Sequence, residues 1–406
     1  MQRSTERILT THAGSLVRTP EVVSFMYKIE HGVPYDVQEF DRCLTSGVGA
    51  VVKQQAAVGV DIPSDGEFGK RGWTQYVAER LAGLAFEAAP GGQYSMSRLA
   101  GAAAEQFQGF YEVYNQIERT LWLPHIEGGA PESVPLPVGS WVCIGPVSYQ
   151  GQAAVHRDIA NFKAALADVD IAEAFMPVVA PCSVESNRPN RYYASEEAYL
   201  YAIAEALRQE YETIVNAGLV LQVDDAWMPA QWACMAPGTT KEEYRKYVQV
   251  RVEALNYALR NIPEDRVRYH ICWGSQNVPH TWDVPLRDIV DLVLEVKAQA
   301  YSIEAANPQH EHEWQVWEEV TLPAGKILIP GVIMHATNIV EHPDLIAWRI
   351  GNFARLVGRE NVIAGTDCGF SQNWNLARVH PEVQWAKLAA LAEGARRATQ
   401  QLWGRA

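Results

Sequence analysis

The chain has 406 residues, which is long for one domain but within the range of a single large α/β barrel with insertions. Hydrophobic residues make up 48% and charged residues 20%, a composition typical of a globular protein with a sizeable core. The formal net charge of −14 disfavours binding to nucleic acids and to anionic membrane surfaces, although a local cationic pocket could still take an anionic substrate.

The sequence contains no apolar segment of signal-peptide length at its start and no apolar run long enough to cross a bilayer. We therefore expect a cytoplasmic protein whose six cysteines are reduced. Reduced cysteines remain available as metal ligands or nucleophiles.

Short apolar runs alternate with longer amphipathic stretches, which is typical of repeated βα units. In chain order, the expected strands are 8–13, 59–64, 140–146, 174–181, 219–224, 267–273, 300–304, 326–332 and 361–366. The expected helices are 36–58, 194–217, 240–261, 284–297, 343–357 and 383–402. The sequence therefore predicts an α/β fold of the (β/α)8, or TIM, barrel type.

The strand count and one irregular segment qualify this prediction. There is one strand candidate more than a barrel needs, so either 140–146 or 174–181 should be peripheral. Residues 85–138 are irregular and rich in Ala, Gly, Pro and Gln, and we expect them to form an insertion over one barrel mouth within a single catalytic domain, 1–406. An open doubly wound sheet is the alternative, but no GxGxxG follows the first strand.

Unusual polar residues follow six of the apolar runs. The runs end in THAGS, SDGE, QVDD, YHICWG, SIEAA and GTDCG. Catalytic groups of a parallel barrel lie at the carboxyl ends of its strands. The pattern therefore predicts an active site at one mouth of the barrel.

A metal centre is the most specific element of that site. His270 and Cys272 are two residues apart, so both side chains point to one face of a strand, while Glu304 and Cys368 end later strands. Two soft thiolates, an imidazole and a carboxylate suit the tetrahedral preference of zinc. The competing interpretation treats these cysteines as small buried hydrophobes and the histidine as a core residue. The shared position at strand ends favours the metal.

These motifs resemble a known family. YHICWG, SIEA and TDCG, in this order, are similar to the zinc-binding motifs of the catalytic domain of cobalamin-independent methionine synthase. THAGSLVRTPE, GVDIPSDGEFGKRGW and GLVLQVDDAW resemble three further segments of that domain. The resemblance covers most of the chain except about 85–138.

The resemblance implies roles for individual residues. It makes His270, Cys272, Glu304 and Cys368 zinc ligands. It assigns Ser15 and Glu67 to the amino-acid end of a homocysteine-like thiol and Asp224 to the ammonium group and to catalysis. His335 is the candidate proton donor. The family's Gln-Ile-Asp-Glu-Pro reads Gln-Val-Asp-Asp-Ala at 222–226, a departure that shortens the second acid and removes the proline.

The resemblance implies a zinc-dependent S-methyltransferase of methionine biosynthesis. A methyl group would pass from a methyl-folate-type donor to homocysteine or a related thiol through a zinc-bound thiolate, because a coordinated thiol is deprotonated. An epoxyalkane:coenzyme M transferase is the alternative, in which cations such as Arg18, Lys70 or Arg71 would hold a sulfonate. The second alternative is a non-catalytic barrel with a closed, structural zinc site.

Lys70 and Arg71 are thus candidate substrate-binding residues, or else ion-pair partners of Glu67. His310 and His312, in HEHEW, are expected in a solvated first helical turn rather than at a metal. We expect core packing for Trp73, Trp141, Trp227 and Trp273, with stacking on a heterocycle as the alternative. We also expect core packing for Cys43, Cys143, Cys182 and Cys234.

Overall fold

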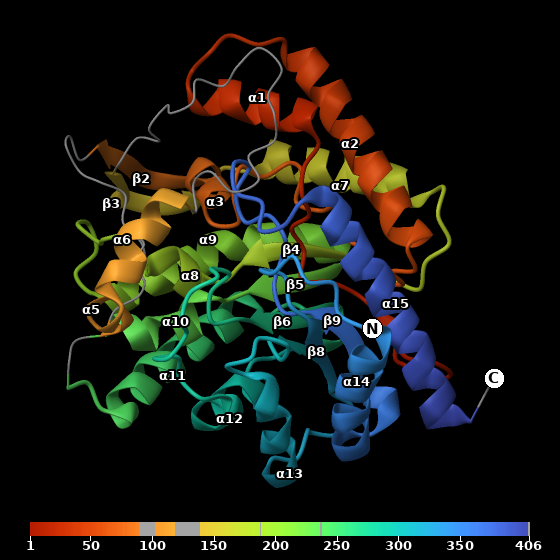
Figure 1. Ribbon diagram of the computed structural model, residues 1–406. Coiled ribbons are helices and arrows are strands. Elements are labelled where there is room, and N and C mark those ends of the chain that lie inside the picture. Colours follow the sequence, from red (N-terminus) through yellow and green to blue (C-terminus); the bar gives the residue numbers. More distant parts are fainter. Residues whose placement is uncertain (89–101, 118–138, 187, 236–237, 405–406) are drawn as a thin grey trace.

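The computed structural model describes residues 1–88, 102–117, 139–186, 188–235 and 238–404 (Figure 1). Seven parallel strands form one curled sheet, in the order β1-β9-β8-β7-β6-β5-β4. Their bounds are β1 Leu9–Thr10, β4 Phe175–Val179, β5 Val220–Asp224, β6 Val267–Ile271, β7 Ala300–Ile303, β8 Ile327–Ile333 and β9 Ile363–Thr366. Each strand is buried along its whole length, as expected when helices cover the outside and side chains fill the inside.

Residues 60–64 connect the two edges of this sheet. Thr11 and Ile62 form a parallel bridge next to β1, and the backbone N–H of Phe175 in β4 donates to Pro63 O at 3.1 Å. Pro63 has no N–H to donate, so this segment pairs too sparsely to count as a full strand. With it in the eighth position the ring is complete, and the predicted barrel is confirmed.

Long helices cover the outside of the sheet (Figure 1). Their bounds are α2 Val37–Ala57, α7 Gln152–Leu166, α9 Glu196–Asn216, α11 Lys241–Ala258, α14 Pro343–Val357 and α15 Pro381–Trp403. Helix α11 begins with a capping box in which Thr240 and Glu243 satisfy each other's backbone N–H groups. The predicted helix 284–297 is much shorter, because only α12, Val290–Leu294, and the 3-10 turn Leu286–Asp288 are helical there.

Shorter elements complete the described chain. They are α1 Pro20–Glu30, α3 Gln75–Arg80, α8 Pro181–Glu185, α10 Trp227–Cys234 and α13 Val316–Glu319, with 3-10 turns at Glu264–Arg266, Glu311–Gln315 and Arg359–Asn361. Helices α8 and α10 follow β4 and β5 directly, so both lie at the carboxyl end of the barrel.

The peripheral strand is 140–146, and 174–181 belongs to the barrel. Strand β3, Gly139–Tyr149, pairs antiparallel with β2, Leu81–Ala88, in a separate two-stranded sheet. Residues of β3 are alternately covered and exposed, whereas all five residues of β4 are buried. Alternating burial is typical of a sheet with one solvent-exposed face, and burial of every residue is typical of a barrel strand.

The predicted insertion is more regular than expected where the structure describes it. It contains β2 and the helices α5, Ala102–Gln106, and α6, Gln108–Ile117; 89–101 and 118–138 lie outside the described residues. The N–H of Asn277 donates to Tyr114 Oη at 3.1 Å, and Trp282 Nε1 donates to Gln106 Oε1 at 3.0 Å. The insertion therefore contacts the loop after β6, at the carboxyl end of the barrel.

No helix within the described ranges combines the length and the apolar character that a membrane crossing needs.

Candidate functional site

A cavity of about 510 Å³ lies at the carboxyl ends of the strands. Its lining comes from the loops after β1, β5, β6 and β9, from residues 67–75, from Arg188 after α8 and from strand β3. The lining residues that bear on function are Ser15, Glu67, Trp73, Trp141, Arg188, Asp224, Trp227, His270, Cys272, Trp273, Ser275, Cys368 and Arg378. This is the mouth at which the strand-end pattern predicts an active site.

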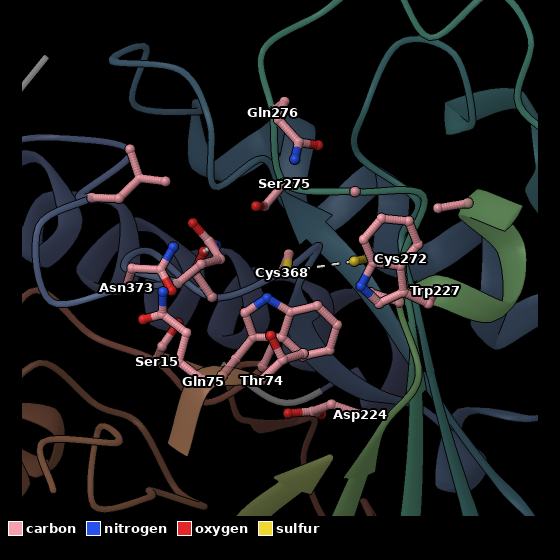
Figure 2. A pocket seen from close by; sticks show the side chains of 18 of the residues that line it. Ser15, Thr74, Gln75, Asp224, Trp227, Cys272, Ser275, Gln276, Cys368 and Asn373 are labelled. Atoms are coloured by element: carbon pink, nitrogen blue, oxygen red, sulfur yellow. Dashed lines mark hydrogen bonds between the residues drawn. The ribbon is translucent and has the colours of Figure 1, made fainter. Parts of the chain in front are cut away.

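Three of the predicted ligands meet on the wall of this cavity. His270 lies in β6, Cys272 follows it by two residues, and Cys368 follows β9. Their ligand atoms all lie within 4.8 Å of one another, and the two Sγ atoms are 3.5 Å apart. Figure 2 shows the two sulfur atoms facing each other across the cavity wall. The three side chains can therefore hold one metal ion.

The imidazole of His270 is oriented for this purpose. Its Nδ1 lies 3.1 Å from Ser302 Oγ, on the neighbouring strand β7, where the register pairs the two residues directly. Its Nε2 is buried and has no hydrogen-bond partner among the described residues. Burial, and then the charge of Arg268, lowers the pKa of His270 to about 3. The ring is thus neutral, with one nitrogen held and the other open, as a metal-ligating histidine requires.

The buried thiol of Cys272 needs a cation to ionise. The hydrogen bond to Cys368, burial, and the negative charges of Cys368 and Glu304 raise the pKa of Cys272 well above its usual range. A metal ion between the sulfurs would reverse this balance, because a coordinating thiol loses its proton. The donor set of one neutral imidazole and two thiols therefore fits a metal.

Glu304 lies beside this group but is not part of it. It follows β7, its Oε2 accepts from the N–H of Trp273 at 3.0 Å, and its Oε1 accepts from Asn307 Nδ2 at 2.9 Å. Both carboxylate oxygens are therefore engaged by nearby donors. The structure brings together three of the four predicted ligands, and the role of Glu304 as the fourth stays a prediction.

The three residues predicted to hold the thiol's far end all line the cavity. Ser15 fits tightly against the loop after Cys368, where a Cβ on Gly369 would lie 2.0 Å from Ser15 Oγ. Glu67 is buried in a left-handed conformation with φ of 59°, held by its N–H bond to Asp65 Oδ1 at 3.0 Å. Such a conformation is costly for a residue with a side chain and is typical of functional sites.

Asp224 ends β5 and projects into the same cavity (Figure 2). Burial, and then the negative charge of Glu67, raises the pKa of Asp224 well above its usual range, while the charge of Lys70 opposes this shift. Gln222 Nε2 donates to its Oδ1 at 2.7 Å. Two acids that repel each other in a buried pocket form a site for a cation.

The predicted cationic residues do not line the cavity. Lys70 Nζ donates to Pro177 O at 2.5 Å and lies 3.6 Å from Glu67 Oε2. Arg71 pairs with Glu79, through Nε at 2.6 Å, and with Glu30. The interpretation of Lys70 as an ion-pair partner of Glu67 therefore fits its position better than substrate contact.

Arg18, the third cation considered for a sulfonate, is buried and bound to the protein. Its guanidinium donates to Glu67 O at 2.8 Å and Lys70 O at 2.7 Å, and to Ser371. It fixes the loop that carries Glu67 and does not line the cavity.

His335 is buried behind the wall and does not line the cavity. Its Nε2 lies 3.3 Å from Ser275 O, and its Nδ1 has no hydrogen-bond partner within the described chain. Burial, and then the charge of Arg378, lowers the pKa of His335 to about 3. It is therefore neutral, and its role as proton donor stays a prediction.

All four tryptophans line the cavity. Core packing is confirmed for Trp273, which belongs to the hydrophobic core, and Trp73 packs against that core. The ring of Trp273 stacks on His310 with 4.0 Å between ring centroids and 23° between planes. The expectation for His310 was wrong, because it is 1% exposed and bonded to Asp283 and Glu313. His312, two residues further, is exposed as predicted. None of the six cysteines, all within the described part, forms a disulfide.

Sequence reasoning missed Ser302 and Arg188. Ser302 lies two residues before Glu304, so the strand period that placed His270 and Cys272 on one face could have identified it. Arg188 lies in an irregular segment after α8, where no periodic signal exists.

A family model described as "Cobalamin-independent synthase, Catalytic domain" matches residues 184–390, just over half of the chain. The methionine synthase of Thermococcus kodakarensis is 21% identical over 372 residues, covering 91% of this chain and 87% of that protein. The 5-methyltetrahydropteroyltriglutamate–homocysteine methyltransferase of Thermotoga maritima is also 21% identical, over 90% of this chain but only 42% of that protein.

Solved structures show the same fold. A B12-independent methionine synthase from Shewanella sp. W3-18-1, in complex with selenomethionine, superimposes with a TM-score of 0.68 at 17% identity, covering 98% of this chain and 100% of that one. A putative vitamin-B12-independent methionine synthase from Listeria monocytogenes gives a TM-score of 0.64, also at 17% identity, with the same coverage.

Proposed function

Because the chain belongs to the family of cobalamin-independent synthase catalytic domains, we propose that it is a zinc-dependent methyltransferase acting on a small aminothiol. The acceptor is homocysteine or a closely related thiol, and the donor is a methylated folate-type molecule. These are the substrates for which a relative, the 5-methyltetrahydropteroyltriglutamate–homocysteine methyltransferase, is named.

The observation that carries this proposal is the position of the ligand group. His270, Cys272 and Cys368 lie on the wall of a cavity that also contains two buried acids, Glu67 and Asp224. A metal that opens onto a substrate-sized cavity is typical of catalytic sites, whereas structural zinc sites are closed. The arrangement therefore favours an enzyme over a zinc-stabilised scaffold.

Zinc is the metal that these donors fit best, since it accepts mixed sulfur and nitrogen ligands in tetrahedral geometry. When bound, it would supply the positive charge that keeps a substrate thiol in its nucleophilic, deprotonated form. Ser302 would keep the Nε2 of His270 turned toward it.

The acids of the cavity recognise the far end of the thiol. Burial, and then the charge of Glu67, raises the pKa of Asp224, and a bound ammonium group would offset both effects, so the pocket gains stability when an aminothiol enters. A sulfonate would meet the negative charge of Glu67, and Arg18, Lys70 and Arg71 are bound to groups of the protein. Arg188 and Arg378 also line the cavity, so the preference for homocysteine over coenzyme M rests on the two acids, Glu67 and Asp224, and not on the charge of the whole lining.

The four tryptophans and the insertion exclude water around the reacting atoms. Such walls orient two substrates for in-line transfer and weaken the competition from hydrolysis. His335 stays the predicted proton donor to the leaving group, and a cytoplasmic location stays a prediction.

Zinc stoichiometry and thiol coordination test the proposal together. We expect about one zinc per chain by elemental analysis, lost in Cys272→Ala and in Cys368→Ala. Cys143→Ala, which removes a buried cysteine outside the cavity, is the matched control and should keep its zinc. X-ray absorption should then show one additional sulfur ligand with homocysteine and none with coenzyme M.

Two results would overturn the proposal. Zinc content that is indifferent to both cysteines would remove the metal centre. An additional sulfur ligand with coenzyme M alone would replace the aminothiol by a sulfonate thiol and reopen the epoxide alternative.

A further inference from the structure

Asp367 lies between strand β9 and the ligand Cys368, and it is completely buried. Its Oδ1 accepts from the backbone N–H groups of Ala305 and Ala306, both at 2.8 Å. These two residues directly follow Glu304, the predicted fourth zinc ligand. One carboxylate oxygen therefore connects the loop after β7, which carries Glu304, to the loop after β9, which carries Cys368.

Strand β8 lies between β7 and β9 in the sheet, so this contact has to pass across it. Gly331 of β8 provides the room. A Cβ at position 331 would lie 2.6 Å from the N and Cα atoms of Asp367 and closer still to its Oδ1. The register of β8 against β9 also shifts just after Gly331, at Val332, and such bulges re-aim side chains next to active sites. The sheet is therefore shaped locally to admit the Asp367 carboxylate.

The two N–H bonds hold the Asp367 side chain in place. Its other oxygen, Oδ2, is buried and has no hydrogen-bond partner within the described residues. A buried carboxylate oxygen without a partner is costly, and the bonds to Ala305 and Ala306 offset part of this cost. They fix the side chain of Asp367 and, at the same time, the backbone that follows Glu304.

The position of this backbone determines where the Glu304 carboxylate can lie. Glu304 is 1% exposed, and its two oxygens accept from the N–H of Trp273 at 3.0 Å and from Asn307 Nδ2 at 2.9 Å. Trp273 directly follows the ligand Cys272, so the carboxylate lies beside the metal group. A shift of the segment that Asp367 holds would move this carboxylate relative to the other ligands, and groups that orient a ligand tune the metal it binds.

We infer that Asp367 is a positioning residue of the metal centre, which holds Glu304 in reach of the ion that Cys368 also binds. The inference rests on the proposed function, since it has a consequence only when zinc binds. It depends on the length of the Asp367 side chain, because its oxygen has to reach across Gly331 to two N–H groups. The negative charge is not needed to accept these bonds.

Two substitutions at this position separate length from charge. Asp367→Asn keeps the length and an oxygen that can accept both N–H bonds, so its Kd for zinc should stay close to that of the parent protein. Asp367→Glu keeps the charge but adds a methylene group for which Gly331 leaves no room. It should raise the Kd for zinc by roughly 10–100-fold, the range typical for loss of a group that orients a ligand. Competition with a chelating dye measures both values in the full chain.

A double-mutant cycle with Glu304→Ala provides a readout that a general loss of stability would not give. If Asp367 acts through Glu304, then Asp367→Glu should change the Kd for zinc little in the Glu304→Ala background. Independent effects would multiply instead. Asp61→Ala is the matched control, because Asp61 also accepts a backbone N–H, from Thr10 at 2.9 Å, and is not among the residues that line the cavity. It should change the Kd for zinc little in either background.

Hydrogen exchange in the parent protein covers the case in which Asp367→Glu does not fold. Coupling between two binding events is reciprocal, so bonds that help Glu304 reach zinc must themselves be strengthened by zinc. We expect zinc to slow the exchange of the N–H groups of Ala305 and Ala306 in the parent protein, and to leave it unchanged in Glu304→Ala.

Four results would overturn the inference: a parent-like Kd for zinc in Asp367→Glu, an equal loss in Asp367→Asn, multiplied losses in the cycle, or exchange at Ala305 and Ala306 that ignores zinc. A parent protein that binds no zinc would overturn the proposed function instead, so the two failures are distinguishable.

Discussion

Ser302 controls the candidate metal centre without being one of its ligands. Its hydroxyl lies 3.1 Å from Nδ1 of His270, and Nε2 of the same ring has no hydrogen-bond partner in the described chain. Loss of a group that orients a ligand typically costs 10–100-fold in metal affinity. We therefore expect Ser302→Ala to weaken zinc binding by roughly 10–100-fold, as measured by competition with a chelating dye.

Ser302→Thr is the matched control for this prediction, because it keeps the hydroxyl and suits a strand. It should retain zinc affinity within a few fold of the parent protein. Equal loss in both variants would indicate that packing in β7, and not the hydrogen bond, holds the imidazole.

At the scale of single residues, the sequence predicts which three side chains meet, but it predicts the charges around them poorly. His270, Cys272 and Cys368 share a strand face or a strand end, and this geometry follows from the strand period alone. The partners of Glu304 are the N–H of Trp273 and the amide of Asn307, which come from loop conformations that no period encodes. Arg71 stands close to Glu67 in sequence, yet it pairs with Glu30 and Glu79 on two helices.

The loop after β6 is held by a buried chain of charged groups. His280 Nδ1 lies 2.7 Å from Asp283 Oδ2. His310 Nε2 lies 3.0 Å from the same oxygen, and His310 Nδ1 lies 2.8 Å from Glu313 Oε2. Hydrogen bonds to these acids outweigh burial and raise the pKa of His280 to about 9 and that of His310 to about 10. Both imidazoles are therefore charged in the folded protein at neutral pH.

The sign of the resulting pH dependence follows from these shifts. Both pKa values lie above the ordinary histidine value of 6.5, so the stabilisation is complete below about pH 6.5 and is lost as the pH rises through 9 to 10. We expect the free energy of unfolding, from urea titrations, to fall between pH 7 and pH 10 by at least about 1 kcal/mol more in the parent protein than in His310→Gln.

His312→Gln is the control for this prediction, since His312 is exposed two residues away and should keep the parent's pH dependence. If His310→Gln shows the same slope as the parent protein, the imidazole of His310 is not charged in the folded state. That result would also weaken the account of how Trp273 is held against the cavity, because its ring stacks on this imidazole.

At the scale of elements, burial pattern separates what the sequence predicts from what it leaves open. Strand β4 is buried throughout, whereas 140–146 mixes covered and exposed positions, but both runs are almost wholly apolar in sequence, so periodicity could not rank the two. The helices α2, α9, α11, α14 and α15 lie within a few residues of their predicted bounds because they carry long amphipathic patterns. The buried position of His310 depends on the distant loop that supplies Asp283, and this contact has no local signal.

At the scale of the whole molecule, the candidate metal centre joins distant parts of the ring. His270 and Cys272 belong to β6 and its loop, while Cys368 follows β9, and two other strands lie between them in the sheet order. The two cysteines lie 96 positions apart in the sequence, so the unfolded chain cannot present the same site. Zinc should therefore bind the folded barrel in strong preference to the unfolded chain and stabilise the global fold.

Mass action sets the size of this effect. A ligand that binds only the folded state stabilises it by about 2.7 kcal/mol at a free concentration of one hundred times its Kd. We expect the free energy of unfolding to rise with the concentration of free zinc, set by a metal buffer, along this logarithmic relation. Chelation should lower the melting temperature.

Cys143→Ala should follow the same curve, displaced downward by a constant packing cost, because its thiol lies outside the ligand group. Cys368→Ala should lose most of the dependence on zinc. A stability that ignores zinc in the parent protein would mean that the three side chains hold no ion across the ring, even though they meet within 4.8 Å.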